Sequence, residues 1–189
     1  MDRQQIEEQV YVALGSNLGD RDGQLAAAIA ALSATDGVEV VAVSPVYETD
    51  PVGPPPQGAY LNATVRLRST LTPGALLGRL LEIEAAQGRS RGSTRDAPRT
   101  LDLDLLFYGD RILAEPDLEL PHPRLADRPF VLEPLCDLAP DFVHPVLQRT
   151  VENLARRVRD PAAVRRHTSP RWTARELGVS LCINSTVSK

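Results

Sequence analysis

Four short segments of the chain have the residue pattern of β-strands. They span residues 10–14, 38–47, 60–68 and 101–108. The first two are rich in apolar and β-branched residues, whereas polar and apolar residues alternate in the other two. Successive side chains of a strand point to opposite faces of a sheet. The last two strands are therefore predicted to have one apolar and one polar face.

This alternation assigns individual side chains to a face. In residues 60–68, Tyr60 and Asn62 belong to the polar face. In residues 101–108, Asp102 and Asp104 share one face. The opposite face of that strand is expected to carry Leu101, Leu103, Leu105 and Phe107.

Apolar residues at helical spacing predict two longer helices between the strands. The first follows the turn at residues 15–20, with Asp20 or Asp22 as its N-cap and with Leu25, Ile29 and Leu32 on one face. The second begins after Thr72, which can cap it, and ends at Gly88.

The element order is strand, helix, strand, strand, helix, strand, which predicts a ferredoxin-like α+β fold with a split βαβ sheet and helices packed on it. Two shorter helices are predicted at residues 130–138 and 150–159. We expect a single domain over residues 8–160 and a loosely ordered C-terminal tail over residues 161–189.

Two proline-rich stretches, residues 50–58 and 120–124, are predicted to be loops because proline blocks helices and central strands. Both follow extended segments. Loops held on rigid elements commonly bind ligands.

Composition narrows the class of protein. The 189 residues are 42% hydrophobic and 24% charged, with a net charge of −4, as in an ordinary globular domain. Cys136 and Cys182 cannot build a disulfide framework or a four-thiolate zinc site alone. With no secretion signal or membrane-length apolar run recognised, we expect a cytoplasmic protein without nucleic-acid or membrane partners.

Asp102 and Asp104 are the sharpest chemical feature. Two carboxylates on one strand face repel each other, and a divalent cation relieves that repulsion. Mg²⁺ characteristically takes one or two carboxylates together with phosphate oxygens. An exposed polar face, or carboxylates paired with arginines, would explain the same pattern without a metal.

The segment before these acids is rich in arginine. Arg89, Arg91, Arg95 and Arg99 fall within eleven positions, against a single acid, Asp96. Arginine binds phosphate in a bidentate manner and stays charged. Together with the acid pair, this loop favours a nucleotide-phosphate site over a merely solvated basic loop.

Other candidates are weaker. Tyr60 and Asn62 suit a flat, amide-bearing heterocycle, although both residue types are also ordinary on a sheet. His122 lies between two prolines and is either a phosphate donor or a structural residue. The turn at residues 15–19 lacks the pattern of a Walker or dinucleotide loop.

The sequence resembles the 6-hydroxymethyl-7,8-dihydropterin pyrophosphokinase family over residues 10–147. The resemblance is carried by several motifs in the same order: Leu14 to Asp20, Tyr47-Glu48-Thr49 with Pro51 and Gly53, Tyr60-Leu61-Asn62, Glu84 with Gly88-Arg89 and Arg91, Arg95 to Leu106, Leu120 to Pro123, and Arg128, Phe130 and Pro134-Leu135.

This resemblance implies that pyrophosphate passes from ATP to the hydroxymethyl group of a reduced pterin, with release of AMP. It implies two Mg²⁺ ions on Asp102 and Asp104. The implied pterin site is Thr49, Val52, Tyr60, Asn62 and Phe130. The implied ATP site is Glu84, Arg89, Arg91, Arg99, Leu105, His122 and Arg128. Arg89, Arg99, Asp102 and Asp104 would be the catalytic residues. We expect a monomer, with a dimer as the alternative.

One position departs from the family pattern. Members often carry Trp where this chain has Asp96, in the loop that closes over the substrates. An acid cannot form the same apolar seal, and it would partly offset the charge of the neighbouring arginines.

Two other classes of function remain possible from the residues alone. A nucleotidyltransferase also combines a Gly-Ser motif with an Asp-x-Asp pair, but here Ser16 and Asp102 are 86 positions apart. A ferredoxin-like module that senses nucleotide is the non-enzymatic alternative, and the arginine-rich loop argues against it.

Overall fold

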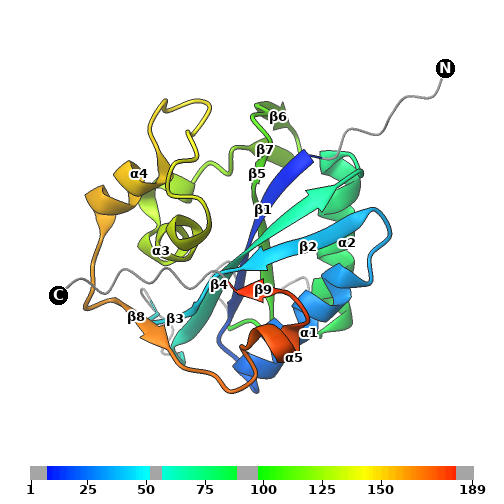
Figure 1. The fold of residues 1–189 in the computed structure, drawn as a ribbon, viewed down its shortest axis with the longest axis vertical. Coiled ribbons are helices and arrows are strands. Elements are labelled where there is room, and N and C mark those ends of the chain that lie inside the picture. Colours follow the sequence, from blue (N-terminus) through cyan, green and yellow to red (C-terminus); the bar gives the residue numbers. More distant parts are fainter. Residues whose placement is uncertain (1–7, 52–56, 89–97, 182–189) are drawn as a thin grey trace.

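The computed structural model describes residues 8–51, 57–88 and 98–181 (Figure 1). The strands are β1 (Glu8–Ser16), β2 (Val38–Val43), β3 (Val46–Thr49), β4 (Tyr60–Ser69), β5 (Asp102–Tyr108), β6 (Leu113–Glu115), β7 (Leu118–Leu120), β8 (Val164–His167) and β9 (Ser180–Leu181). The helices are α1 (Arg21–Ser33), α2 (Pro73–Ala86), α3 (Pro129–Leu138), α4 (Val151–Val158) and α5 (Ala174–Leu177), with a 3-10 turn, η1 (Leu125–Asp127).

The main sheet confirms the predicted ferredoxin-like α+β fold. Its order is β5-β1-β4-β2, and these neighbours are antiparallel. The central strand β1 pairs with β4 along its whole length, from Glu8 opposite Ser69 to Ser16 opposite Leu61. The predicted caps also form, because Asp20 accepts from the backbone N–H of Gly23 and Thr72 accepts from that of Ala75.

Alternation along β1 builds a core on each face of the sheet. Val10, Val12 and Leu14 pack with the apolar residues of α1 and α2. Tyr11 and Ala13 pack on the other face with those of α3 and α4. The two helix pairs therefore lie on opposite sides of the sheet (Figure 1).

The predicted strand 38–47 is two strands rather than one. The break falls at Ser44 and Pro45, where proline has no N–H for a sheet hydrogen bond. Ser44 remains tied to β4, since its N–H donates to the Thr64 carbonyl and its Oγ accepts from the Thr64 N–H, both at 2.9 Å. β2 and β3 thus both pair with β4 but at different positions along it: β2 pairs with residues 65–69 and β3 with residues 60–62.

The face assigned to Phe107 is wrong. A β-bulge shifts the pairing of β1 with β5 between Tyr11 and Val12, so that Phe107 packs towards α3 and α4. Leu101, Leu103 and Leu105 keep the predicted orientation towards α1 and α2. One extra residue in a strand reverses the alternation beyond it, and a regular period of two cannot anticipate that.

The described part of the segment after residue 160 contributes two strands to the sheet. β8 pairs antiparallel with β3, and β9 pairs parallel with β2. Trp172 is buried among the residues of the α1 and α2 core. The sequence predicted a loosely ordered tail over residues 161–189, of which residues 182–189 lie outside the described residues. The weak periodicity of the segment gave no indication of such short strands.

Candidate active site

A pocket opens where β1, β4 and β5 meet the beginning of α3. Its lining comes from segments far apart in sequence: Ala13, Leu14, Gly15, Thr49, Asp50, Pro51, Gln57, Tyr60, Asn62, Ala63, Arg99, Asp102, Asp104, Arg124, Arg128, Phe130 and Val131. The sheet supplies the floor, and the start of α3 and the loops supply the walls.

Gly15 makes the floor of this pocket continuous. It lies on β1 opposite Asn62 of β4 on one side and Asp102 of β5 on the other. A Cβ at this position would lie 3.6 Å from Asn62 Oδ1 and 3.8 Å from the Asp102 Cβ, so a side chain here would fill the space between them. Glycine therefore leaves more room in the pocket between the amide of β4 and the carboxylates of β5.

One end of the pocket carries an amide and an aromatic ring. Asn62 is buried, and its Nδ2 donates to Thr49 Oγ1 at 2.8 Å. Tyr60 donates through its hydroxyl to Gln57 Oε1 at 3.1 Å. Phe130, in the first turn of α3, faces the same cavity. These groups fit a flat heterocycle with polar edges.

The other end carries the two predicted acids, and the structure confirms that they share a face. Arg99 Nη1 donates to Asp102 Oδ2 at 2.8 Å, and Arg128 Nη1 donates to Asp104 Oδ2 at 3.0 Å. The side chains of the acids are 24% and 31% exposed, so both remain reachable from solvent. The arginines offset the repulsion between the two carboxylates.

The donor set bears on metal binding. Among the described residues, no cluster of three or more His, Cys, Asp or Glu side chains could hold a metal ion. Two carboxylates do fit Mg²⁺, whose remaining ligands are commonly phosphate oxygens and water. A metal at this pair would therefore take its remaining ligands from phosphate oxygens or from water.

Comparison with known proteins identifies the family. Residues 11–140 match the family described as 7,8-dihydro-6-hydroxymethylpterin-pyrophosphokinase (HPPK). The chain belongs to the HPPK family. The enzyme transfers a pyrophosphoryl group from ATP to hydroxymethyldihydropterin in folate synthesis.

Curated HPPK relatives cover most of the chain. The 2-amino-4-hydroxy-6-hydroxymethyldihydropteridine pyrophosphokinase of Pseudomonas aeruginosa is 45% identical over 148 residues, which are 78% of this chain and 91% of that protein. The protein of the same name in Bacillus subtilis is 44% identical over 128 residues, which are 68% of this chain and 76% of the relative.

Solved structures support the fold. A crystal structure of Plasmodium falciparum HPPK-DHPS superposes with a TM-score of 0.67 at 15% identity. The match covers 87% of this chain and 50% of that one, so the present chain spans about half the length of that protein. At this identity the likeness concerns the fold alone.

His122 approaches the acid pair of this HPPK as a neutral imidazole. Burial lowers its pKa from the ordinary value, although the nearby Asp104 carboxylate acts in the opposite direction. Its Nδ1 accepts from the backbone N–H of Arg124 at 3.2 Å, which assigns the proton to Nε2. Nε2 lies 3.6 Å from Asp104 Oδ2, too far for a hydrogen bond. The imidazole thus presents an N–H beside the acids.

Glu84 connects α2 to the acid-bearing strand. Its side chain is buried, and its Oε1 accepts from the backbone N–H of Leu103 at 2.7 Å. Leu103 lies between the two acids in sequence. Glu84 therefore fixes the main chain from which both carboxylates project.

Asn17 is a site residue that sequence reasoning missed. It is buried, and its Oδ1 accepts from the backbone N–H of Arg99 at 2.7 Å. Its own N–H donates to the Arg99 carbonyl at 3.1 Å, and its Nδ2 donates to Gln57 Oε1 at 2.8 Å. Asn17 thus joins Arg99, at the end of the arginine-rich segment, to Gln57, near the end of the first proline-rich stretch. No local pattern signalled this role, because the partners of Asn17 lie 82 and 40 positions away along the chain.

Some predicted site residues are not placed in the pocket. Val52, Arg89 and Arg91 lie outside the described residues. Leu105 is described, but its side chain is buried in the core against α1 and α2. A contribution of Leu105 to ATP binding would have to come from its main chain.

Proposed function

We propose that the two ends of the pocket hold the two substrates of the HPPK reaction. The main supporting observation is that the buried Asn62 amide and the Asp102 and Asp104 carboxylates line one pocket, with Gly15 between Asn62 and Asp102. The pterin would lie at the amide end, and the ATP phosphates at the acid end.

At the amide end, we assign the pterin to Thr49, Val52, Tyr60, Asn62 and Phe130. Asn62 can both donate to and accept from a pyrimidinone edge, and its bond to Thr49 fixes which way the amide points. Phe130 supplies an apolar face against which the ring can stack.

At the acid end, we assign ATP to Glu84, Arg89, Arg91, Arg99, Leu105, His122 and Arg128. The Nε2 proton of His122 and the guanidinium of Arg128 both lie beside Asp104, where they can also donate to phosphate oxygens. Glu84 acts through the strand that it holds.

Asp102 and Asp104 would hold Mg²⁺, two ions in the full complex, which would neutralise charge on the phosphate oxygens. The two carboxylates are now partnered by Arg99 and Arg128. On substrate binding, Arg99 would exchange its carboxylate partner for a phosphate oxygen. We also assign to Arg89, which lies outside the described residues, a role on the transferred group.

The pterin hydroxyl would attack the β-phosphorus of ATP in line with the leaving group. A bond forms between the hydroxymethyl oxygen and the β-phosphorus, the bond from that phosphorus to the bridging oxygen of AMP breaks, and the hydroxyl proton passes to solvent. Arg99 and Arg89 would stabilise the charge that develops on the phosphate oxygens.

The test is AMP release from ATP and Mg²⁺, measured with and without 6-hydroxymethyl-7,8-dihydropterin. We expect AMP only with the pterin, and almost none from Asp104→Asn. Asp110→Asn is the matched control, because Asp110 is exposed in the turn after β5. Free pyrophosphate with a nucleotidylated pterin would instead indicate a nucleotidyltransferase. Normal turnover by Asp104→Asn would overturn the assignment of the acids.

We also propose that the chain acts as a monomer in the cytoplasm. In the part of the chain that the structure describes, no helix combines the length and apolarity needed to cross a bilayer. Light scattering of the purified protein tests the monomer, and a mass of two chains would contradict it.

A further inference from the structure

Residues 164–172, which we call the C-terminal arm, lie beyond the matched family region of residues 11–140. The arm begins as β8 and pairs antiparallel with β3, from Val46 opposite His167 to Thr49 opposite Val164. Figure 1 shows β8 beside β3 at the edge of the sheet. β3 is thus held between β4 and β8.

The arm reaches the rim of the pocket through Arg165. Its Nη2 lies 3.0 Å from Asp50 Oδ1 and its Nη1 lies 3.2 Å from Asp50 Oδ2, a bidentate pair. Asp50 and its neighbour Thr49 both line the pocket. Thr49 is also the residue that orients the Asn62 amide. The arm therefore contacts the main chain and the side chain of the segment that borders the amide end.

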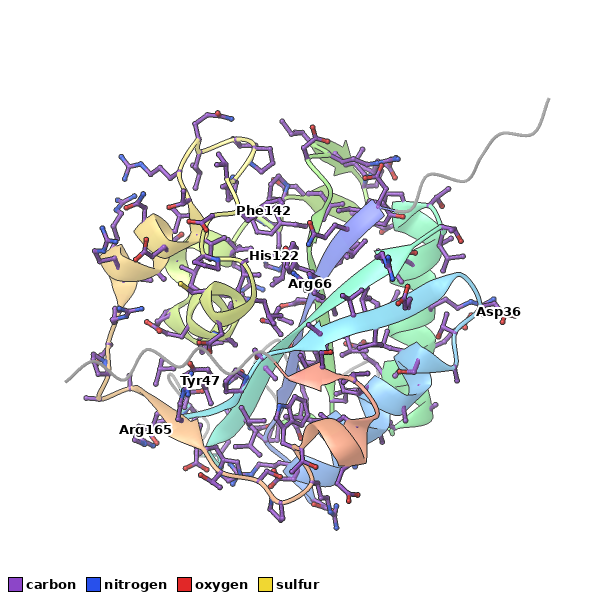
Figure 2. All side chains as sticks on the ribbon, viewed as in Figure 1. Asp36, Tyr47, Arg66, His122, Phe142 and Arg165 are labelled. Carbon is purple, nitrogen blue, oxygen red and sulfur yellow. The ribbon has the colours of Figure 1, made fainter. Side chains whose placement is uncertain are left out.

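Arg166 connects the same arm to α3. Its Nη2 lies 3.2 Å from Asp137 Oδ1, and the Tyr47 hydroxyl donates to Asp137 Oδ2 at 2.6 Å. The Asp137 side chain is only 12% exposed, so Arg166 compensates a largely buried charge. Figure 2 shows Tyr47 and Arg165 on the same side of the molecule. α3 is the helix that carries Phe130 in its first turn.

The far end of the arm is anchored separately. Trp172 is buried and its Nε1 donates to the Ser44 carbonyl at 2.7 Å. Arg171 forms an ion pair with Asp20, the N-cap of α1. Anchorage at Trp172 keeps β8 in place without depending on Arg165 or Arg166.

We propose that the C-terminal arm positions the pterin end of the pocket. It holds Thr49 and Asp50 on one wall through Arg165, and the helix of Phe130 on the other wall through Arg166. The arm thereby sets the affinity for the pterin and leaves ATP binding unchanged. This inference rests on the proposed assignment of Asn62 and Phe130 to the pterin.

The test is steady-state kinetics of the full chain carrying Arg165→Gln and Arg166→Gln. Loss of two ion pairs, one exposed and one to a buried acid, is expected to raise the pterin KM about fivefold or more. The ATP KM and kcat should stay within about twofold, because the acid end is untouched. Arg156→Gln with Arg157→Gln is the matched control, since both arginines are exposed on α4.

An unchanged pterin KM in the folded double variant would overturn the proposal. An equal rise in the ATP KM would also overturn it, because that result indicates general loosening of the fold. If the double variant does not fold, Asp137→Asn must raise the pterin KM in its place. Asn62→Ala separates the two claims. If Asn62→Ala leaves the pterin KM unchanged, the assignment of the pterin to this end of the pocket fails. If Asn62→Ala raises the pterin KM but the arginine variants leave it unchanged, the role of the arm fails.

Discussion

Asp102 and Asp104 each have an arginine within hydrogen-bond distance, at 2.8 and 3.0 Å. At the scale of single residues, this pairing explains how two neighbouring acids can share a strand face before a substrate arrives. The same arginines can then turn to phosphate, because arginine binds carboxylate and phosphate with the same planar set of donors.

Arg99→Ala tests this exchange. If Arg99 stabilises charge that develops during transfer, kcat should fall about 100-fold or more, since loss of one such donor commonly has that effect. The ATP KM should change far less, because the gain arises in the transition state. The measurement is steady-state kinetics beside Arg79→Ala, an exposed arginine of α2. A kcat equal to that of the control would remove Arg99 from the catalytic residues.

The sequence predicted the acid pair because a two-residue spacing on a strand determines which way both side chains point. It could not predict Asn17, whose bonds reach residues 82 and 40 positions away. Local patterns carry no information about such distant partners. The functional assignments of the site residues stay predictions until the kinetic tests are made.

At the scale of elements, α2 and β5 are joined by a buried carboxylate. Glu84 is 3% exposed and accepts from the Leu103 N–H at 2.7 Å. The Glu84 side chain accepts a main-chain hydrogen bond that a neighbouring strand would otherwise accept. Without it, the Leu103 N–H would be buried without a partner.

Glu84→Ala should therefore destabilise the fold by about 1–3 kcal/mol, the usual cost of leaving a buried donor unsatisfied. The measurement is urea denaturation, with Glu82→Ala as the control because Glu82 is exposed on the same helix. If both variants lose the same stability, the bond to Leu103 contributes nothing measurable.

The period of hydrophobic residues predicted most elements but not their irregularities. The helices α1 and α2 and the strands β4 and β5 lie where alternation and helical spacing placed them. The bulge beside Val12 was missed because it depends on pairing with another strand. The break at Pro45 did have a local signal, the proline itself, but the run of β-branched residues around it was interpreted as one strand. The residue pattern of one strand does not show where its pairing with a neighbouring strand becomes irregular.

At the scale of the whole molecule, residues near the C-terminal end of the described chain pair with strands near its beginning. The segment from Val164 to Leu181 returns to pair with β3 and then with β2, strands formed more than a hundred residues earlier. The hydrophobic periodicity of this segment is weak. Its short strands are therefore stabilised by tertiary contacts rather than by local β-propensity. That is why the sequence suggested a domain boundary near residue 160.

A substitution at Trp172 tests how much this segment contributes to the stability of the fold. It is 8% exposed, and Trp172→Ala should cost about 3–5 kcal/mol of unfolding free energy, as removal of a large core side chain does. Val146→Ala is the control, because Val146 is 55% exposed. Chemical denaturation in one cooperative transition gives both values. A loss no larger than in the control would show that residues 8–160 carry the stability alone, as the sequence suggested.

The arrangement of the substrates is tested most directly by a crystal structure of the chain with Mg²⁺, a non-hydrolysable ATP analogue and 6-hydroxymethylpterin. We predict the pterin between Asn62 and Phe130, and the phosphates at Asp102 and Asp104 with metal between them. Arg99 should have left Asp102 for a phosphate oxygen. A nucleotide bound away from both acids, or acids facing solvent without a cation, would contradict this account.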